Sequence, residues 1–336
     1  MIRYVIRRLL GAALVVWIVS VVTFLIFQLA PTLTHNSAIY YYINRQPPAK
    51  GSLQYKLLLH AYGFDRPLVS QYWHWLTQIF STHSITDGYS AENCHLPCLG
   101  YSFRLHTAVT TLIWQALPVS LSLAVGAALL WLFGGVLVGT ISGLRPGSIF
   151  DRAGMTGALA AVSLPIFFTG PLLLLLVVYH WKWMTNVDYA GITQDPTQWL
   201  KSMILPWITL ALSFAALYAR LTRANMREVM GEDYIRTARA KGLPRRTVVI
   251  KHGLRSALTP IITIFGIDVG TLIGNTVITE TVFNLRGLGH LSIQAINGHD
   301  LPVTMGVTIV AAIALVIANI VVDILYAVVD PRVSYA

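Results

Sequence analysis

Six long stretches that are almost free of charge constrain this chain more than any other feature of its sequence. They are residues 9–30, 111–144, 153–179, 202–219, 256–279 and 301–329. Five of the six reach the roughly 20 residues that a helix needs to cross a bilayer core of about 30 Å, and the fourth is slightly shorter. Only 11% of all residues are charged, against roughly 25% in soluble domains. The sequence therefore predicts an all-α integral membrane protein with six transmembrane helices.

The basic residues between these stretches predict which side of the membrane each connection occupies. If the N-terminus is cytoplasmic, the inner connections carry 16 of the 24 Lys and Arg, whereas the outer connections, about twice as long in total, carry 8. Basic residues accumulate in cytoplasmic loops, so both termini are predicted to be cytoplasmic. The net charge of +10 lies at the ends of apolar stretches, which argues for membrane topology and against nucleic-acid binding.

This topology divides the chain into three parts. Residues 1–30 are an N-terminal tail and the first span, residues 31–110 are an extracytoplasmic insert between spans 1 and 2, and residues 111–336 are a five-span core with a cytoplasmic loop at 220–255. In the insert, apolar residues at helical spacing predict a helix after Pro67, with Asp65 as its N-cap. The insert is either a cap on the outer membrane face or a contact surface for an external partner, and the two roles are compatible.

Cysteine and histidine usage gives little sign of a metal site. Cys94 and Cys98 are the only cysteines, and they lie in the insert, on the predicted oxidising side. A short disulfide and two free thiols both remain open, and metal binding is less favoured. The histidines are scattered without the spacing of metal ligands. No metal site is predicted.

Glycine and proline mark irregular places in two of the spans. Gly135 and Gly139 are four residues apart in the second span, a spacing that lets helix backbones approach closely. Close packing against another span is favoured there over a bend that lines a substrate path. In the third span, Pro165 and Gly170-Pro171 predict a kink or break, which either lines a cavity or reflects irregular packing.

The cytoplasmic loop belongs to a strongly basic block. Residues 218–260 hold ten of the 24 Lys and Arg and only three acidic residues, with an apolar segment on each side. One interpretation is a solvated loop that the positive charge holds inside. The other is a small folded knob that docks into a partner.

The order of residues in this block favours the knob. A short helix is predicted from Glu232 to Lys241, with one apolar edge made of Tyr234, Ile235 and Ala238. Gly242 can end that helix in the left-handed conformation, and Pro244 can begin the next helix. A solvated loop would explain the charge but not this Ala-Gly-Pro order.

The same segment resembles a known motif. Tyr234-x2-Thr237-Ala238-Arg239-Ala240-Lys241-Gly242-Leu243 is similar to the EAA coupling loop of binding-protein-dependent ABC importer permeases, in particular the dipeptide/oligopeptide (nickel) branch. Arg236 and Thr237 replace the Glu and first Ala of the general motif, as that branch commonly shows, and Leu254-Arg255 replaces a later Leu-Pro. Further matches cover nearly the whole chain, among them Phe64-Asp65-Arg66-Pro67-Leu68, Glu280-Thr281-Val282-Phe283 and Gly287-Leu288-Gly289. The departures fall in residues 31–60 and 81–105, which bear on partner docking.

The resemblance implies that ATPase subunits grip this loop, and that their closure on ATP switches the spans between inward-open and outward-open states. The coupling residues it implies are Tyr234, Arg236, Thr237, Ala238, Lys241, Gly242 and Pro244. The sequence has no G-x4-G-K-[ST] phosphate loop, so ATP and Mg are expected on separate ATPase chains, with no cofactor and no enzymatic activity in this chain. The other implied partners are a second related permease, one or two ABC ATPase subunits, an extracytoplasmic solute-binding protein and lipid of a bacterial or archaeal cytoplasmic membrane.

Two groups of polar residues are candidates for the transport path. Asp268 lies 12 residues into the fifth span, about 18 Å along the helix at roughly 1.5 Å per residue, where an ionisable group usually faces a cavity or a partner. It is either a substrate-path residue that contacts a peptide amino group, with Asn275 as a second candidate, or a packed structural acid. The outer loop with Asn284, Arg286, Gly287 and Gly289 is either a gate, whose glycines allow a tight re-entrant path, or a simple connector.

Together these features predict the permease subunit of an ATP-driven importer for short peptides. A nickel or other small-solute importer is the alternative within the class. A stand-alone ion-coupled carrier or a membrane-embedded enzyme is the alternative outside it. No His lies in the six apolar stretches, which argues against serine-type intramembrane proteolysis, and no convincing internal repeat matches the inverted repeats usual in carriers.

Overall fold

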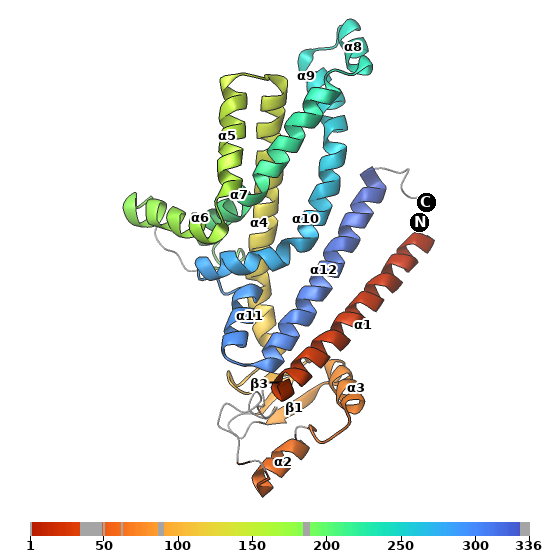
Figure 1. The fold of residues 1–336 in the computed structure, drawn as a ribbon, viewed down its shortest axis with the longest axis vertical. Helices are drawn as coiled ribbons and strands as arrows, with labels where there is room; N and C mark the ends of the chain where they lie inside the picture. Colours follow the sequence, from red (N-terminus) through yellow and green to blue (C-terminus); the bar gives the residue numbers. More distant parts are fainter. Residues whose placement is uncertain are drawn as a thin grey trace. The chain divides into compact units, whose positions relative to one another are not determined.

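The computed structural model of the protein describes residues 2–33, 49, 51–61, 63–86, 91–183 and 189–329, most of them in helices (Figure 1). In chain order the elements are α1 (Ile2–Leu33), α2 (Leu53–Ala61), α3 (Leu68–Ile79), β1 (His83–Thr86), β2 (Ala91–Cys94), β3 (Tyr101–Ser102), β4 (Thr107–Ala108), α4 (Val109–Leu144), α5 (Ile149–Ser163), α6 (Ile166–Leu173), the π-helix η2 (Leu174–His180), α7 (Pro196–Val229), α8 (Asp233–Ala240), α9 (Arg245–Thr247), the π-helix η3 (Val248–Leu254), α10 (Arg255–Val282), α11 (Leu288–Asn297) and α12 (Leu301–Val329). The chain divides into two compact units, residues 1–118 with 286–316 and residues 119–285 with 317–336.

The membrane-crossing helices correspond to the six apolar stretches. Five described helical runs are long and apolar enough to cross a membrane, and the pair α5 and α6–η2 makes a sixth if it counts as one span. That pair is bent by 108°. The predicted break is confirmed at Pro165, which stands between the two helices as the N-cap residue of α6. Pro171 lies inside α6 and does not end it, and the helix changes to the π-helix η2 three residues later, at Leu174.

The fourth membrane helix differs from its prediction in length. α7 continues to Val229, ten residues past the end of the apolar stretch, so that Arg220, Arg223 and Arg227 lie on helix rather than in a loop. Arginine is a good helix former, and its long side chain can carry the charge away from apolar surroundings. Charge therefore marks the end of an apolar stretch without marking the end of a helix.

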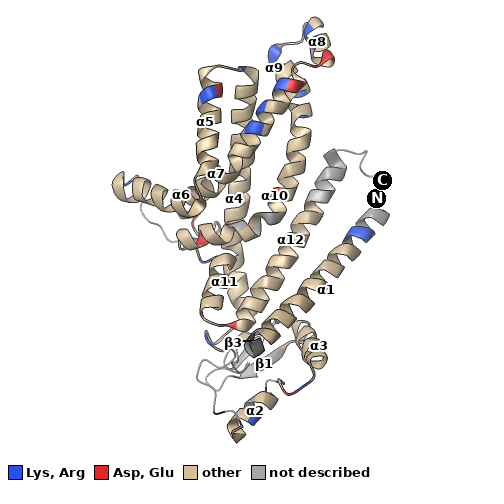
Figure 2. Ribbon diagram, in the orientation of Figure 1, with Lys and Arg blue, Asp and Glu red and all other residues tan. Residues whose placement is uncertain are grey.

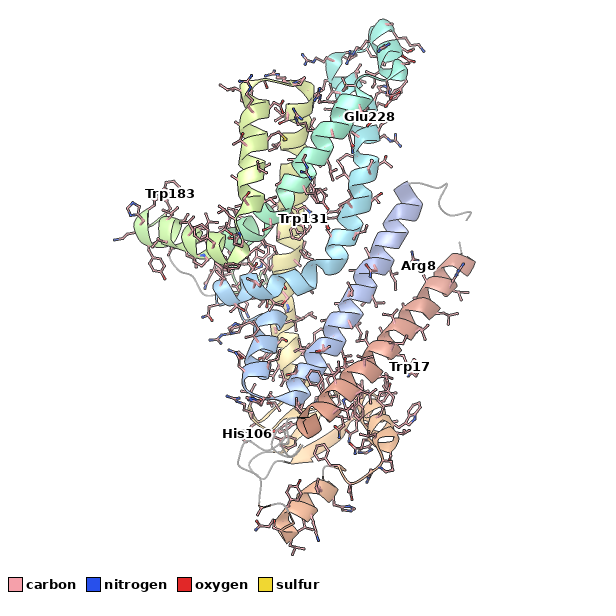
Figure 3. All side chains as sticks on the ribbon, in the orientation of Figure 1. Arg8, Trp17, His106, Trp131, Trp183 and Glu228 are labelled. Carbon is pink, nitrogen blue, oxygen red and sulfur yellow. A yellow bond between two sulfur atoms is a disulfide. The ribbon has the colours of Figure 1, made fainter. Side chains whose placement is uncertain are left out.

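In the second unit a seam of glycines lets α4 approach α7 closely. A Cβ atom on Gly135 would lie 2.5 Å from the Tyr218 Cβ, and one on Gly143 would lie 2.8 Å from the Met226 Cβ. Gly139, between them, faces the backbone of α7 even more closely. The close packing predicted from the Gly135-x3-Gly139 spacing is thus confirmed. Figure 3 shows Trp131 of the same helix within this unit, where its ring stacks on Phe214.

The first unit contains small strands that the sequence did not predict. β1 pairs with β2 and β3 pairs with β4, each pair antiparallel, and a disulfide joins Cys94 at the end of β2 to Cys98. The predicted helix after Pro67 is present as α3. The cap assigned to Asp65 was wrong, because Pro67 is the N-cap residue and the Asp65 carboxylate instead contacts His60 Nδ1 at 2.7 Å.

Asp300 is a buried carboxyl group of the first unit, placed directly before α12. The Ser102 hydroxyl donates a hydrogen bond to Asp300 Oδ2, and the backbone N–H of Val303 donates to Oδ1 at 3.3 Å. Burial raises the pKa of the Asp300 carboxyl above its ordinary value, although these hydrogen bonds and Arg104 act in the opposite direction. The carboxyl therefore makes the stability of this unit depend on pH.

We expect Asp300→Asn to remove part of that dependence. A raised pKa means that the folded state holds the proton more tightly than the unfolded chain does. The protonated carboxyl therefore contributes its full stabilisation of the fold below about pH 3.8, and this stabilisation is lost as the pH rises through the raised pKa. The thermal midpoint of the variant in detergent, relative to wild type, should rise as the pH increases from about 3.8 through the raised pKa. A difference between the two proteins that stays constant over this range would contradict the assignment.

Candidate functional site

The helix predicted from Glu232 to Lys241 is present as α8, Asp233–Ala240, and it ends in a glycine cap. Gly242 has a φ of +74°, the left-handed conformation that the sequence predicts. Its N–H donates to the carbonyl oxygen of Arg239 at 3.0 Å, and the N–H of Leu243 donates to that of Ala238 at 3.3 Å. This pair of bonds satisfies the last carbonyls of the helix. The turn after α8 is therefore fixed by hydrogen bonds within the backbone.

Buried side chains anchor α8 to the helices on both sides of it. Ile235 and Ala238 pack against Val248 of η3, with Val229 and Met230 at the end of α7 completing the cluster. Ile235 has no exposed surface. The short helix is therefore held against the end of α7 and the start of the next long helix, and a displacement of α8 acts on both.

The predicted coupling residues divide between buried and exposed positions. Ala238 is buried, whereas the others are exposed, namely Tyr234, Arg236, Thr237, Lys241, Gly242 and Pro244. Tyr234 was predicted to share the apolar edge with Ile235 and Ala238, but 44% of its surface is exposed. The buried face is centred on Ile235 and Ala238, which leaves Tyr234 at its margin with its ring available to a partner.

Pro244 begins a long continuous helical run. It is the N-cap residue of α9, and α9 passes through η3 into α10 without an intervening loop. The knob predicted from the sequence is therefore the start of a membrane helix rather than a separate small domain. Figure 2 shows Lys and Arg gathered at α8, α9 and the adjoining ends of α5 and α7.

An ion pair that sequence reasoning missed ties α5 to α7 within the same unit. Arg223 donates from Nε to Asp151 Oδ1 at 2.5 Å and from its terminal nitrogen to Oδ2 at 2.8 Å. The N–H of Gly147 also donates to Oδ2, at 2.9 Å, and Ser148 Oγ accepts from the Asp151 N–H. Ser148-x2-Asp151 has the form of a helix N-terminal cap, and that signal could have located one end of the pair. Nothing in the sequence pointed to Arg223 as its partner.

The candidate substrate-path residue Asp268 contacts α7. The Tyr218 hydroxyl donates to Asp268 Oδ2 at 2.8 Å, next to aromatic rings of Trp131 and Phe265. This hydrogen bond is what a structural role in helix packing requires of the Asp268 carboxyl. Its role in transport stays a prediction. Asn275 lies on α10, but its side chain is outside the described part of the structure.

The candidate gate loop has a different geometry from the one predicted. Asn284, not a glycine, takes the positive φ of +50°, which Asn tolerates better than most residues. Gly287 has an ordinary extended backbone as the N-cap residue of α11, and Gly289 is a buried residue of that helix. Arg286 is exposed. The glycines therefore do not supply the tight turn, and a gating role stays a prediction.

The contacts described above include no metal site. Across the described ranges, no group of three or more His, Cys, Asp or Glu side chains could hold a metal ion. The main feature of the site is a short capped helix, α8, that is packed against the ends of two long helical runs.

Comparison with known proteins agrees with this architecture. Residues 135–335 match the family described as binding-protein-dependent transport system inner membrane component, and residues 1–124 match the corresponding N-terminal family. A putative peptide transport system permease protein of Brucella abortus is 35% identical over 331 residues, 98% of each chain. The dipeptide transport system permease protein DppB of Escherichia coli K12 is 35% identical over 302 residues, 83% of this chain and 84% of the relative.

Among solved structures, a chain of the MetNI methionine ABC transporter in an inward-facing conformation has a similar fold. The TM-score is 0.53 at 19% identity, and the match covers 66% of this chain and 97% of that chain. At this identity the likeness concerns the fold alone.

Proposed function

The chain belongs to the family of binding-protein-dependent transport system inner membrane components, and on this premise we propose that it is the permease subunit of an ATP-driven ABC importer for short peptides. The two relatives described above, a peptide and a dipeptide transport permease, support the substrate class. An external solute-binding protein delivers the peptide, and a second related permease completes the pathway. The chain is a transport component of the inner membrane, with both termini on the cytoplasmic side.

One observation carries the mechanism, namely the anchoring of α8 to both neighbouring helices through Ile235. An ATPase subunit that binds ATP and Mg grips the exposed side of α8, where Tyr234, Arg236 and Lys241 lie. When the ATPase subunits close, α8 moves with them. Because the end of α7 and η3, which continues into α10, are packed on α8, both membrane helices follow, and the pathway alternates between its two states.

The transport path in this proposal includes polar groups of α10. Asp268 provides a carboxylate for a peptide amino group once its bond to Tyr218 is released, and Asn275 provides an amide in the same helix. The loop from Asn284 to Gly289 covers the outer end of the path. These assignments rest on the cost of an ionisable group at membrane depth and on position in the chain.

The docking of α8 is tested by Tyr234→Ala. We expect the variant to bind the cognate ATPase about 30-fold more weakly, because truncating an anchoring tyrosine at an interface costs about 2 kcal/mol. Folding should be unaffected, since the ring lies at the margin of the buried cluster. The measurement is a titration of labelled ATPase onto the reconstituted permease pair, with ATP-driven peptide uptake as a second readout.

Phe80→Ala is the matched control for this titration. Phe80 is also an exposed aromatic residue, 73% exposed, but it follows α3 in the predicted extracytoplasmic insert. Its truncation should leave ATPase affinity unchanged. Equal affinities of wild type and Tyr234→Ala would refute docking through α8.

A further inference from the structure

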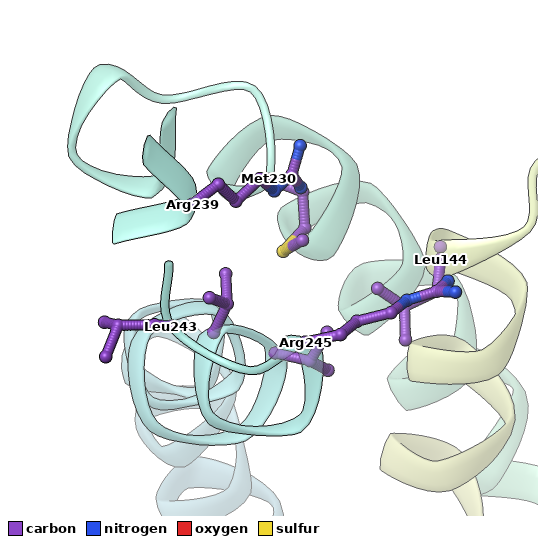
Figure 4. Close-up of a pocket in the computed structure, with 8 residues that line it drawn as sticks. Leu144, Met230, Arg239, Leu243 and Arg245 are labelled. Atoms are coloured by element: carbon purple, nitrogen blue, oxygen red, sulfur yellow. The ribbon is translucent and has the colours of Figure 1, made fainter. Parts of the chain in front are cut away.

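A pocket of about 430 Å³ lies beside the Gly242 turn in the second unit (Figure 4). Its walls come from the end of α4, the end of α7 and both sides of the turn. The lining residues are Gly143, Leu144, Met230, Arg239, Leu243, Arg245, Val248 and Val249. The volume falls within the range of ordinary ligand sites, and the mechanism described above does not use it.

Two guanidinium groups face this pocket from opposite sides of the turn. Arg239 belongs to the last turn of α8, and Arg245 is the first residue of α9. Figure 4 shows the Arg245 side chain extending toward Leu144, while that of Arg239 lies beside Met230. Neither side chain has a hydrogen bond or ion pair with any residue that the structure describes. Both arginines are exposed, and two positive charges on one pocket make it a favourable place for an anion.

None of the residues that line the pocket is acidic, so the lining itself supplies no anion. Residues 218–260 contain ten Lys and Arg and three acidic residues, and of these three Asp233 lies 3.4 Å from Arg236. The pocket borders the helix that the ATPase grips in the proposed function. A docked ATPase is therefore the partner best placed to supply the negative charge.

The walls of the pocket favour a carboxylate over a phosphate. Leu144, Val248 and Val249 are apolar and can hold the stem of a side chain, while its charged end makes a charge-assisted hydrogen bond to a guanidinium group. Gly143 and Leu144 are also the last residues of α4, and the carbonyl end of a helix carries about half a negative charge. That charge repels a dianionic phosphate more than a carboxylate with a single charge.

We propose that this pocket receives an Asp or Glu side chain of the ATPase, whose carboxylate accepts hydrogen bonds from Arg239 and Arg245. This inference rests on the proposed function, because it requires a partner docked on α8. The two arginines lie on either side of Gly242, one on α8 and one at the start of the run that becomes α10. A single carboxylate between them therefore connects the ATPase to both arms of the turn.

The test measures the affinity of the purified cognate ATPase for the permease pair in nanodiscs of zwitterionic lipid. Arg239→Gln and Arg245→Gln should each weaken binding about tenfold, the usual worth of a charged hydrogen bond. The fold-loss of affinity in the double variant should be smaller than the product of the two single fold-losses, because both arginines share one carboxylate. Arg239→Lys keeps the charge but not the fork of donors, so its loss should be smaller than that of Arg239→Gln.

Arg246→Gln and Lys251→Gln are the matched controls, since both residues are exposed basic neighbours that do not line the pocket. They should change affinity less than about threefold. Unchanged affinity in Arg239→Gln and Arg245→Gln would overturn the inference and leave the proposed function standing. If the wild-type permease pair did not bind its cognate ATPase, the proposed function itself would be refuted.

A second arm distinguishes a lipid occupant. Binding of phosphatidylglycerol to the permease pair is measured by native mass spectrometry for wild type and both arginine variants. If the variants lose this lipid while ATPase affinity is unchanged, the pocket is a lipid headgroup site and the inference is wrong. If lipid binding is unchanged and ATPase affinity falls, the carboxylate assignment is supported.

Discussion

Gly139→Leu should prevent the protein from reaching its native fold. A Cβ atom at this position would overlap the carbonyl oxygen of Ala219 and lie 2.6 Å from the Thr222 Cβ. These are backbone and Cβ atoms of α7, so no rotation of a side chain can relieve the overlap. The helices would have to separate along the whole glycine seam, and overpacking of this kind costs about 3 kcal/mol or more, a large part of the 5–15 kcal/mol typical of a domain.

Gly134→Leu provides the control for this result on the same helix. A Cβ atom on Gly134 would meet nothing within 4 Å, so the same added side chain should be tolerated. Gly139→Ala adds only the Cβ atom and should fall between the two variants. The measurement is the monodisperse fraction after solubilisation together with the thermal midpoint. Similar values for Gly134→Leu and Gly139→Leu would show that the seam is not tight.

Arg223→Gln should destabilise the second unit by about 3 kcal/mol, toward the lower end of the range for breaking a buried ion pair. The variant leaves the Asp151 carboxylate, whose side chain is 4% exposed, without its guanidinium partner. The destabilisation lies toward the lower end because the Arg223 side chain is itself 28% exposed, and water screens part of the interaction. Thermal unfolding in detergent measures the loss.

A double-mutant cycle shows whether the loss belongs to the pair. Asp151→Asn combined with Arg223→Gln removes both charges, so the double variant should be more stable than Arg223→Gln alone. Arg220→Gln, at an exposed arginine one turn earlier on α7, is the control and should change stability by less than about 0.5 kcal/mol. Losses that simply add across the cycle would indicate two independent roles for Asp151 and Arg223.

The features that sequence reasoning predicted well are those encoded by neighbouring residues. Gly242 followed by Pro244 fixes a left-handed helix end and a helix start within three positions, and the structure has both. Pro165 breaks the third span for a similarly local reason. Composition alone was enough to predict the six apolar stretches, because a bilayer requires a similar length of every helix that crosses it.

The features that were missed depend on contacts between distant residues or on very short elements. Asp151 and Arg223 are 72 positions apart, and no local pattern joins them. The exposure of Tyr234 depends on where Val248 packs against α8, which a pattern within α8 cannot show. The strands of the first unit are four residues long or shorter, too short to give a clear alternation of apolar and polar residues.

The anchoring of α8 has a consequence for how such a protein can evolve. The residues that hold the helix, Ile235, Ala238 and Val248, are separate from those that face outward, such as Tyr234 and Lys241. Mutations can therefore alter the outward set without disturbing the inward one. In the proposed function the outward set recognises the ATPase, so after gene duplication one copy can acquire a different ATPase while it keeps its pathway.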